Sequence, residues 1–328
     1  MVSGGRRSPA GVDGLADALA AALGPRAVRN APLGARTTYR VGGTAAVLVE
    51  VDSEDDLVAV HHALASVRPD VPLLVLGNGS NMLVADAGFP GLVVVPGAGL
   101  GVIGIEGTTV RAGGAAMLPL VARRSAAAGL TGLEWAVGVP GTVGGALKMN
   151  AGGHGSDTAA VLVRQRLFDV VTGRGAEDGA QRLELAYRHS SLGDGQVVVW
   201  AEFALAAGSA TEAQAALSEI VRWRRAHQPG GSNAGSVFTN PPGDAAGRLV
   251  EEAGLKGFRL GSAQVSAKHA NFIQADDGGS ADDVRRLIEH VGRVVLDTAG
   301  VTLVPEVRFV GFDQEQSQRP STSCGGSS

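Results

Sequence analysis

One alternating pattern between residues 45 and 96 constrains the fold of this chain most. Short apolar runs typical of buried strands occur at 47–51, at 73–76, around Leu83 and at 92–95. Between the first two runs, Ser53 with Asp56 three positions later is the pattern of a helix N-terminal cap. Strands that alternate with a helix indicate an α/β unit with at least one right-handed crossover.

A mixed α+β pattern continues beyond this unit. We expect a helix at 118–128 and strands at 161–170 and 197–205. The glycine pattern Gly99, Gly101, Gly104 matches a dinucleotide-binding fingerprint, but 105–110 has the pattern of a turn and a strand. No helix N-terminus then faces a pyrophosphate, so we interpret these glycines as a structural turn.

A smaller α+β unit is predicted to begin after residue 207. Thr211 is expected to cap a helix that ends near His227, with Ile220 and Trp223 in the core. A second helix at 282–297 carries one apolar face, and strands around Phe272 and at 301–310 complete the unit. The predicted division is 1–26 (a segment with a short helix at 13–23), 27–207, 208–312 and a disordered tail at 313–328, residues 1–11 also being mobile.

Composition excludes several classes of function. The chain has 328 residues, 45% of them hydrophobic, and a formal net charge of −4. That charge gives no positive field for nucleic acid, and no apolar run is long enough to span a membrane. The single cysteine, Cys324, is typical of a reducing compartment, and the histidines lack metal-ligand spacing. We expect a cytoplasmic monomer without a metal site.

Two glycine-rich segments point to a phosphate-containing ligand. The segment 77–81 (GNGSN) follows an apolar strand and can turn several backbone N–H groups toward one anion, although Asn-Gly is also an ordinary turn pair. The segment 137–152 has many small residues around Pro140, which suits a backbone lying against a flat ligand. Asn150 could hydrogen-bond such a ligand; a structural loop is the alternative.

Seven segments in a fixed order give the chain a close resemblance to the MurB family of flavoprotein reductases. They are TTYRVGG (37–43), GNGSN (77–81), VGVPGTVGGALKMNAG (137–152), YRHS (187–190), AGSVFTNP (234–241), GLKG with VSAKHANFI (254–273) and PEVRF (305–309). The resemblance covers the chain from about residue 31 to residue 312.

The resemblance implies an FAD-binding PCMH-type fold of two subdomains with a smaller α+β substrate-binding domain. It implies NADPH-dependent, FAD-mediated reduction of UDP-N-acetylglucosamine enolpyruvate to UDP-N-acetylmuramate in peptidoglycan precursor synthesis, with NADPH and the sugar nucleotide binding in turn. The FAD is expected to be noncovalent. The residues expected to bind it are Arg40, Gly77, Asn78, Gly79, Ser80, Asn81, Val139, Thr142, Gly145, Asn150 and Gly152.

The resemblance also assigns three catalytic residues. Arg188 would stabilise the enolate-like charge on the substrate carboxylate, because a guanidinium can hold a carboxylate with two parallel hydrogen bonds. Ser236 would protonate the substrate carbon, and Glu306 would hold the enolic intermediate or pass a proton. From the pattern alone, Arg188 could be a surface ion-pair residue, Ser236 a turn residue and Glu306 the partner of Arg308.

The substrate-contacting residues are less sharply defined. Tyr187, Arg225, Lys268 and Asn271 are candidates. Thr239 stands where many members of the family have lysine, which affects one phosphate or NADPH contact. The stretch from Tyr187 to residue 203 lacks the tyrosine-bearing insertion of one branch, so the chain is similar to the family's second type.

Two other functions remain open at the level of sequence. An FAD oxidase of the same fold could use His154, which follows the second glycine segment. A binding module without catalysis is possible because a fold alone does not prove activity. The set of Arg188, Ser236 and Glu306 favours the reductase.

Overall fold

The computed structural model describes residues 10–67 and 71–312. The expected tail at 313–328, with Cys324, lies outside the described residues, as do residues 1–9. The α-helices are α1 (Ala10–Leu23), α2 (Glu54–Val67), α3 (Leu118–Ala127), α4 (Val143–Met149), α5 (Ala210–His227), α6 (Ala246–Glu252) and α7 (Ala281–Ala299). Short 3-10 turns are η1 (Gly24–Arg26), η2 (Gly34–Arg36), η3 (Ala98–Leu100), η4 (Glu134–Gly138), η5 (Thr158–Ala160) and η6 (Ala180–Leu183).

The first sheet confirms the predicted α/β unit. Its order is β1-β2-β5-β3, with β1 (Ala27–Ala31), β2 (Ala45–Val51), β3 (Leu73–Val75) and β5 (Phe89–Pro96). Strands β2 and β3 both run parallel to β5, and α2 connects β2 to β3. The predicted cap is present, since the Asp56 backbone N–H donates to Ser53 Oγ and the Ser53 N–H donates to the Asp56 carboxylate.

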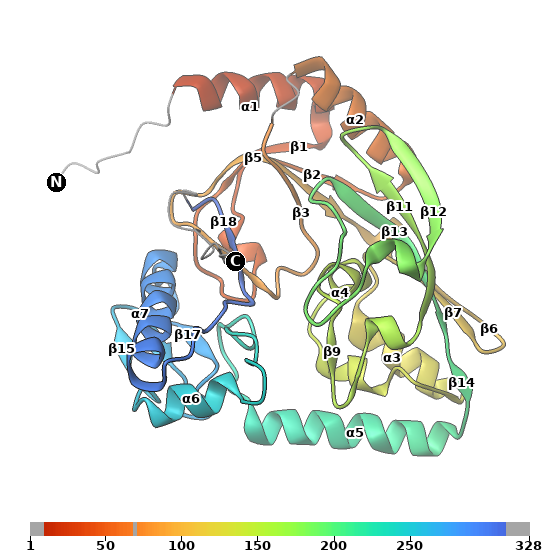
Figure 1. Cartoon of the computed structure of the whole chain (residues 1–328). Coiled ribbons are helices and arrows are strands. Elements are labelled where there is room, and N and C mark those ends of the chain that lie inside the picture. Colours follow the sequence, from red (N-terminus) through yellow and green to blue (C-terminus); the bar gives the residue numbers. More distant parts are fainter. Residues whose placement is uncertain (1–9, 68–70, 313–328) are drawn as a thin grey trace, which may run out of the picture.

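A second, antiparallel sheet forms the other half of the larger unit (Figure 1). Its order is β12-β11-β13-β7-β6, with β6 (Ile103–Glu106), β7 (Thr109–Gly113), β11 (Leu162–Asp169), β12 (Arg174–Gly179) and β13 (Gln196–Ala204). Helices α3, α4 and α5 contribute to the core of this half. Two small ladders join β8 (Leu130–Thr131) to β14 (Ala206–Ala207) and β9 (Gly152–Gly153) to β10 (Ser156–Asp157). Gly99 and Gly101 lie at η3, before β6, and no helix follows, so the structural-turn interpretation is confirmed.

The C-terminal unit is an antiparallel three-stranded sheet covered by α7. Its strands are β15 (Arg259–Leu260), β16 (Ala263–Val265) and β17 (Ile273–Ala275), in that order. Helix α7 buries the predicted apolar face, formed by Val284, Leu287, Ile288, Val291 and Val295. The mixed α+β prediction is confirmed for this unit as well.

Three details of the C-terminal prediction were wrong. Helix α5 is capped by Ser209, whose hydroxyl accepts from the Glu212 N–H, and Thr211 lies inside the helix. Trp223 is 44% exposed instead of buried. Strand β18 (Arg308–Val310) pairs in parallel with β4 (Met82–Val84), so the end of the chain adds a strand to the first unit. Figure 1 shows β18, in blue, beside segments of the N-terminal half.

Candidate active site

One cavity of about 580 Å³ gathers the conspicuous segments of the sequence. It is lined by the loop between β3 and β4, by the glycine-rich segment that enters α4, and by residues 192–194. Arg188, Ser236 and Glu306 complete its wall from three distant parts of the chain. The cavity therefore lies where both halves of the larger unit meet the C-terminal segments.

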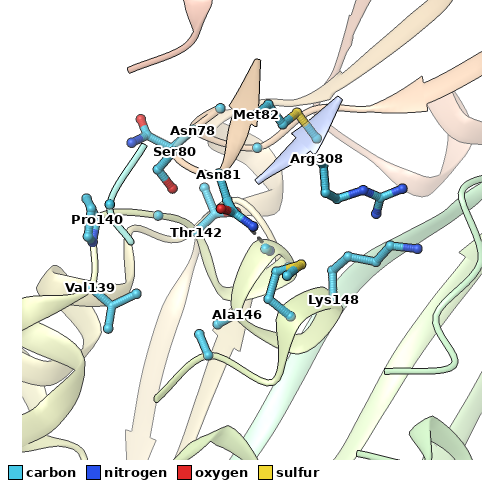
Figure 2. A pocket seen from close by; sticks show the side chains of 18 of the residues that line it. Asn78, Ser80, Asn81, Met82, Val139, Pro140, Thr142, Ala146, Lys148 and Arg308 are labelled. Carbon is cyan, nitrogen blue, oxygen red and sulfur yellow. Dashed lines mark hydrogen bonds between the residues drawn. The ribbon is translucent and has the colours of Figure 1, made fainter. Parts of the chain in front are cut away.

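The first glycine segment forms a backbone cradle that tolerates no larger residue at two positions. Gly79 has φ +59°, and a Cβ there would lie 2.7 Å from the Arg36 carbonyl oxygen. A Cβ on Gly77 would lie 2.5 Å from Thr142 Oγ1, so the two glycine segments touch. Figure 2 shows Asn78, Ser80 and Asn81 of this cradle opposite Pro140 and Thr142. Backbone N–H groups beside small side chains are the kind of site that suits a phosphate.

The second glycine segment is held rigidly against the antiparallel sheet. Thr142 caps α4 by accepting a hydrogen bond from the Gly145 N–H at 3.2 Å. The Gly144 N–H donates to the Gly114 carbonyl at 2.8 Å, and the Val143 N–H donates to Ala116 at 2.9 Å. This loop therefore presents a preformed, mostly apolar wall to the cavity.

Arg188 and Glu306 meet in the cavity although 118 positions separate them (306 − 188). Arg188 Nε lies 2.9 Å from Glu306 Oε1, and Arg188 Nη2 donates to the Gly152 carbonyl at 3.2 Å. The Arg188 Nε–H is buried and has no acceptor in line, so the contact with Glu306 is an ion pair without an aligned hydrogen bond. Arg188 also has φ +54°, a left-handed conformation that is rare for arginine. Strained backbone of this kind is concentrated at functional sites.

The Glu306 carboxyl is partly buried, and its pKa is raised. Its side chain is 15% exposed. Burial raises the pKa of Glu306 above its ordinary value, and the nearby Arg188 guanidinium opposes this only in part. A carboxyl in such surroundings can hold a proton closer to neutral pH than a solvated one can.

A backbone ladder places Ser236 beside the segment that carries Glu306. The Glu306 N–H donates to the Val237 carbonyl at 2.7 Å, and the Val237 N–H donates to the Asn271 carbonyl at 2.8 Å. The buried Asn271 side chain adds two hydrogen bonds to the backbone of Phe238, at 3.0 and 2.9 Å. Ser236 and Glu306 are therefore positioned by a common, buried frame.

The structure brings most of the predicted site residues together. Those that line the cavity are Gly77, Asn78, Gly79, Ser80, Asn81, Val139, Thr142, Gly145, Gly152, Arg188, Ser236 and Glu306. Six others do not line it: Arg40, Asn150, Tyr187, Arg225, Lys268 and Asn271.

These six residues have other surroundings in this structure. Arg40, Tyr187 and Arg225 are exposed. The Lys268 ammonium donates to the Arg225 carbonyl. The Asn150 amide group, 2% exposed, is hydrogen-bonded to the Asp157 carboxylate, the Ala186 carbonyl and the Ala159 N–H. A buried amide with all its partners inside the protein stabilises the loop and has no free group for a ligand.

Sequence reasoning missed several charged residues of the cavity. Lys148 and Arg308 both contact Asp194 Oδ1, at 3.0 and 2.9 Å, so Arg308 does not pair with Glu306. Figure 2 shows Lys148 and Arg308 extending toward the same side of the cavity. Arg224 also lines the cavity, whereas its neighbour Arg225 was the residue predicted. Helical spacing could have separated these two arginines, since α5 buries Ala213, Leu217 and Ile220 on one face.

The described part of the chain contains no group of three or more metal-ligating side chains close enough to hold a metal ion. Among the described helices, none is both long enough and apolar enough to cross a membrane.

The cavity has the features that a large nucleotide cofactor needs, namely a narrow glycine cradle joined to an apolar wall. The contact between Gly77 and Thr142 makes the two glycine segments one continuous surface, which fits a dinucleotide such as FAD.

Comparisons with known proteins agree with this geometry. The FAD binding domain family matches residues 45–176, and the C-terminal domain of UDP-N-acetylenolpyruvoylglucosamine reductase matches residues 227–310. A UDP-N-acetylenolpyruvoylglucosamine reductase from Rubrobacter xylanophilus is 40% identical over 88% of this chain and 97% of its own length. The one from Azorhizobium caulinodans is 41% identical over 91% and 97%, respectively.

Solved structures extend the agreement to three dimensions. The crystal structure of the Thermus caldophilus UDP-N-acetylenolpyruvylglucosamine reductase (MurB) superposes with a TM-score of 0.75 at 34% identity, covering 87% of this chain and 98% of that one. A berberine-bridge-enzyme-like protein of Physcomitrella patens shares the fold, with a TM-score of 0.52 at 14% identity over 86% of this chain and 88% of that one. The chain belongs to the UDP-N-acetylenolpyruvoylglucosamine reductase (MurB) family and has the FAD-binding PCMH-type fold with a MurB C-terminal domain.

Proposed function

We propose that this protein reduces UDP-N-acetylglucosamine enolpyruvate to UDP-N-acetylmuramate, with NADPH as electron donor and FAD as cofactor, in peptidoglycan precursor synthesis. The observation that carries the proposal is the Arg188–Glu306 ion pair at 2.9 Å, in the cavity that both glycine segments line. Family membership over nearly the whole chain supports the same activity.

FAD would be held without a covalent bond by the two glycine segments. The cradle 77–81 would bind the pyrophosphate through backbone N–H groups, and Val139, Thr142, Gly145 and Gly152 would face the rest of the cofactor. When bound, FAD would supply hydride chemistry at this site, with NADPH as the source of its electrons.

Arg188 would stabilise the negative charge that develops on the substrate carboxylate. Its guanidinium is positively charged and lines the cavity, so it would attract a carboxylate that enters there. The charge is stabilised more strongly in a partly dry cavity than in water. Arg188 is held in place by Gly152 and by Glu306.

Ser236 would donate the proton to the substrate carbon next to the one that receives hydride. A serine hydroxyl is a weak acid, so this step needs the strongly basic enolate as acceptor. Glu306, whose pKa is raised by burial, would hold a proton near the same substrate face. Because a hydrogen-bonded backbone ladder joins the two segments, their side chains would keep a constant separation during turnover.

The division into domains and the subtype are part of this proposal. We place the FAD-binding part at 27–207, the substrate-binding part at 208–312 and a tail at 313–328. The chain between Arg188 and the start of β13 at Gln196 is a short loop, which supports the second type of the family. Tyr187, Arg225, Lys268 and Asn271 would contact substrate only after a rearrangement, and Arg40 and Asn150 would support the FAD loops from outside the cavity.

We also propose that the protein acts as a cytoplasmic monomer. The three groups that the mechanism needs, Arg188, Ser236 and Glu306, line one cavity within a single chain, which supports a monomer. Sedimentation velocity would show a species of about 33 kDa. A stable dimer at micromolar concentration contradicts this part of the proposal.

An oxidase remains the second candidate because His154 lines the same cavity. Anaerobic stopped-flow absorbance at the flavin band separates the two functions. The protein is reduced with NADPH and then mixed with UDP-N-acetylglucosamine enolpyruvate or with oxygen. Fast reoxidation by the sugar nucleotide and slow reoxidation by oxygen are expected. Fast reoxidation by oxygen alone would establish the oxidase, and a protein that binds no flavin would refute both.

A further inference from the structure

An aromatic cluster at the end of α5 lies on the cavity wall. Trp223 is 44% exposed and lines the cavity. Its ring stacks on His227, with centroids 4.6 Å apart and 19° between the planes. His154, which also lines the cavity, meets the indole edge-on at 5.2 Å. Two flat side chains therefore hold the indole in one orientation.

The exposure of Trp223 has no explanation in the packing of α5. The helix buries Ala213, Leu217 and Ile220 against the antiparallel half, while Trp223 stays accessible. An indole left in water forgoes the stabilisation that its burial would give. Stacking between positions 223 and 227 is a pair on the helix surface, whereas His154 reaches the same indole from the tight turn between β9 and β10.

A positive charge lines the same cavity as this ring. Arg224 lines the same cavity, and burial lowers the pKa of its guanidinium. Among the described residues, no carboxylate lies within ion-pair distance of Arg224, although Arg188 and Arg308 each have one. A cation that is half-buried without a partner favours an anionic ligand at this end of the cavity. A flat ring beside a phosphate is the chemistry of a nucleotide.

We propose that Trp223, supported by His154 and His227, stacks the base of a nucleotide ligand, and that Arg224 attracts its phosphates. The inference rests on the proposed function, which provides two such ligands, the UDP-sugar and NADPH. Stacking on an aromatic side chain accepts any base, because every base has a π face. The subsite can therefore serve either ligand or both in turn.

Equilibrium binding to the oxidised FAD-containing protein tests this subsite without turnover. UDP and NADP⁺ are titrated separately by isothermal calorimetry into the wild type, Trp223→Ala, Trp223→Phe and Trp200→Ala. Trp223→Ala is expected to weaken one or both ligands roughly 5- to 150-fold, the range of base stacking. Trp223→Phe should retain most of the affinity, since it keeps a π face. Trp200→Ala is the matched control and should leave both affinities unchanged. Trp200 lies on β13 under the guanidinium of Arg111 and does not line the cavity.

The pattern of losses identifies the ligand. Loss for UDP alone assigns the subsite to uracil, loss for NADP⁺ alone assigns it to a base of the dinucleotide, and loss for both shows a shared subsite. Arg224→Met should weaken the same ligand and reduce the dependence of its affinity on salt. Unchanged affinities in Trp223→Ala, or loss of its FAD, would overturn the proposal. If the wild type binds neither nucleotide, the proposed function fails instead.

Discussion

Arg188 is the residue whose chemistry is hardest to replace. It contacts Glu306 and Gly152 at once, and its planar guanidinium has several donors in a fixed arrangement. Lysine keeps the charge but cannot bind a carboxylate through two parallel hydrogen bonds. The single ammonium group of lysine also cannot reach the Glu306 carboxylate and the Gly152 carbonyl from two separate nitrogen atoms, as Arg188 does.

We expect Arg188→Lys to lower kcat roughly 100-fold or more, the range for losing one oriented donor to a developing negative charge. The FAD content should stay unchanged, because the cradle 77–81 is not altered. Steady-state kinetics with flavin absorbance checks both values. Arg259→Lys is the matched control, since Arg259 forms an exposed pair with Asp276. Normal turnover in Arg188→Lys would remove Arg188 from the mechanism.

Glu306 should make stability depend on pH in a distinctive direction. Burial raises its pKa in the folded protein, partly opposed by Arg188. The folded state therefore holds this proton more tightly than the unfolded state does. The resulting stabilisation is complete below the unfolded pKa and is lost as pH rises through the folded pKa.

Glutamine does not titrate, so the Glu306→Gln variant should not lose stability in this way. The Tm of the variant minus the Tm of wild type is therefore expected to increase as the pH rises from about 4.5 toward neutral. Glu202 is the control with the opposite sign, because hydrogen bonds from Arg164 lower its pKa. Its contribution is present above the unfolded pKa and is lost as pH falls. Thermal unfolding of wild type, Glu306→Gln and Glu202→Gln tests both directions when it is extended from neutral pH down to about pH 3, below the ordinary pKa of Glu202. Equal slopes for the two variants would contradict the assignment.

At the scale of elements, glycine positions separate a ligand loop from a structural turn. Gly79 has a positive φ and lies against the Arg36 backbone, so any side chain there displaces the cradle. Gly104 is the last glycine of the fingerprint pattern and lies in strand β6, where a Cβ would meet nothing within 4 Å. The same substitution should therefore change FAD binding at Gly79 and leave it unchanged at Gly104.

Gly79→Ala is expected to reduce the fraction of purified protein that carries FAD, whereas Gly104→Ala should leave it at the wild-type level. The absorbance ratio of flavin to protein measures this directly. Circular dichroism shows whether each variant is folded. Full FAD content in Gly79→Ala would mean that the cradle does not hold the cofactor.

At the scale of the whole molecule, β18 joins the C-terminal unit to the first α/β unit. Its pairing with β4 places Arg308 opposite Met82 and Val310 opposite Val84. Val310 is buried in a core shared with Leu33 and Leu48 of the first unit. Because Glu306 lies just before this strand, the pairing also sets where the Glu306 carboxyl lies.

We expect Val310→Asp to separate the parts of the molecule, because a buried carboxylate is costly in an apolar core. Calorimetry should show a transition at lower temperature than in wild type, and turnover should fall with it. Val304→Asp is the matched control, since Val304 is 58% exposed and should tolerate the change. A wild-type Tm and activity in Val310→Asp would show that the β4–β18 pairing does not couple the two parts.

Local pattern was sufficient for most of the elements. The α/β unit at 45–96, the apolar face of α7 and the capping of α2 follow from hydrophobic spacing and short-range hydrogen bonding, which a linear sequence contains directly. The two glycine segments were found for the same reason. Short strands such as β12, which is exposed along most of its length, have little hydrophobic signal and were not predicted.

Contacts between distant segments were decided only by the tertiary structure. Nothing local says that Arg188 pairs with Glu306 while Arg308 pairs with Asp194, or that Arg224 lines the cavity when Arg225 does not. The strand at 308–310 was assigned to the wrong sheet because pairing depends on which edge is free and not on the strand's own residues. The sequence by itself determined the elements and the chemistry they carry, since these depend on neighbours along the chain. Which of those groups share one cavity depends on packing between segments that lie far apart in the sequence, and only the folded molecule shows that.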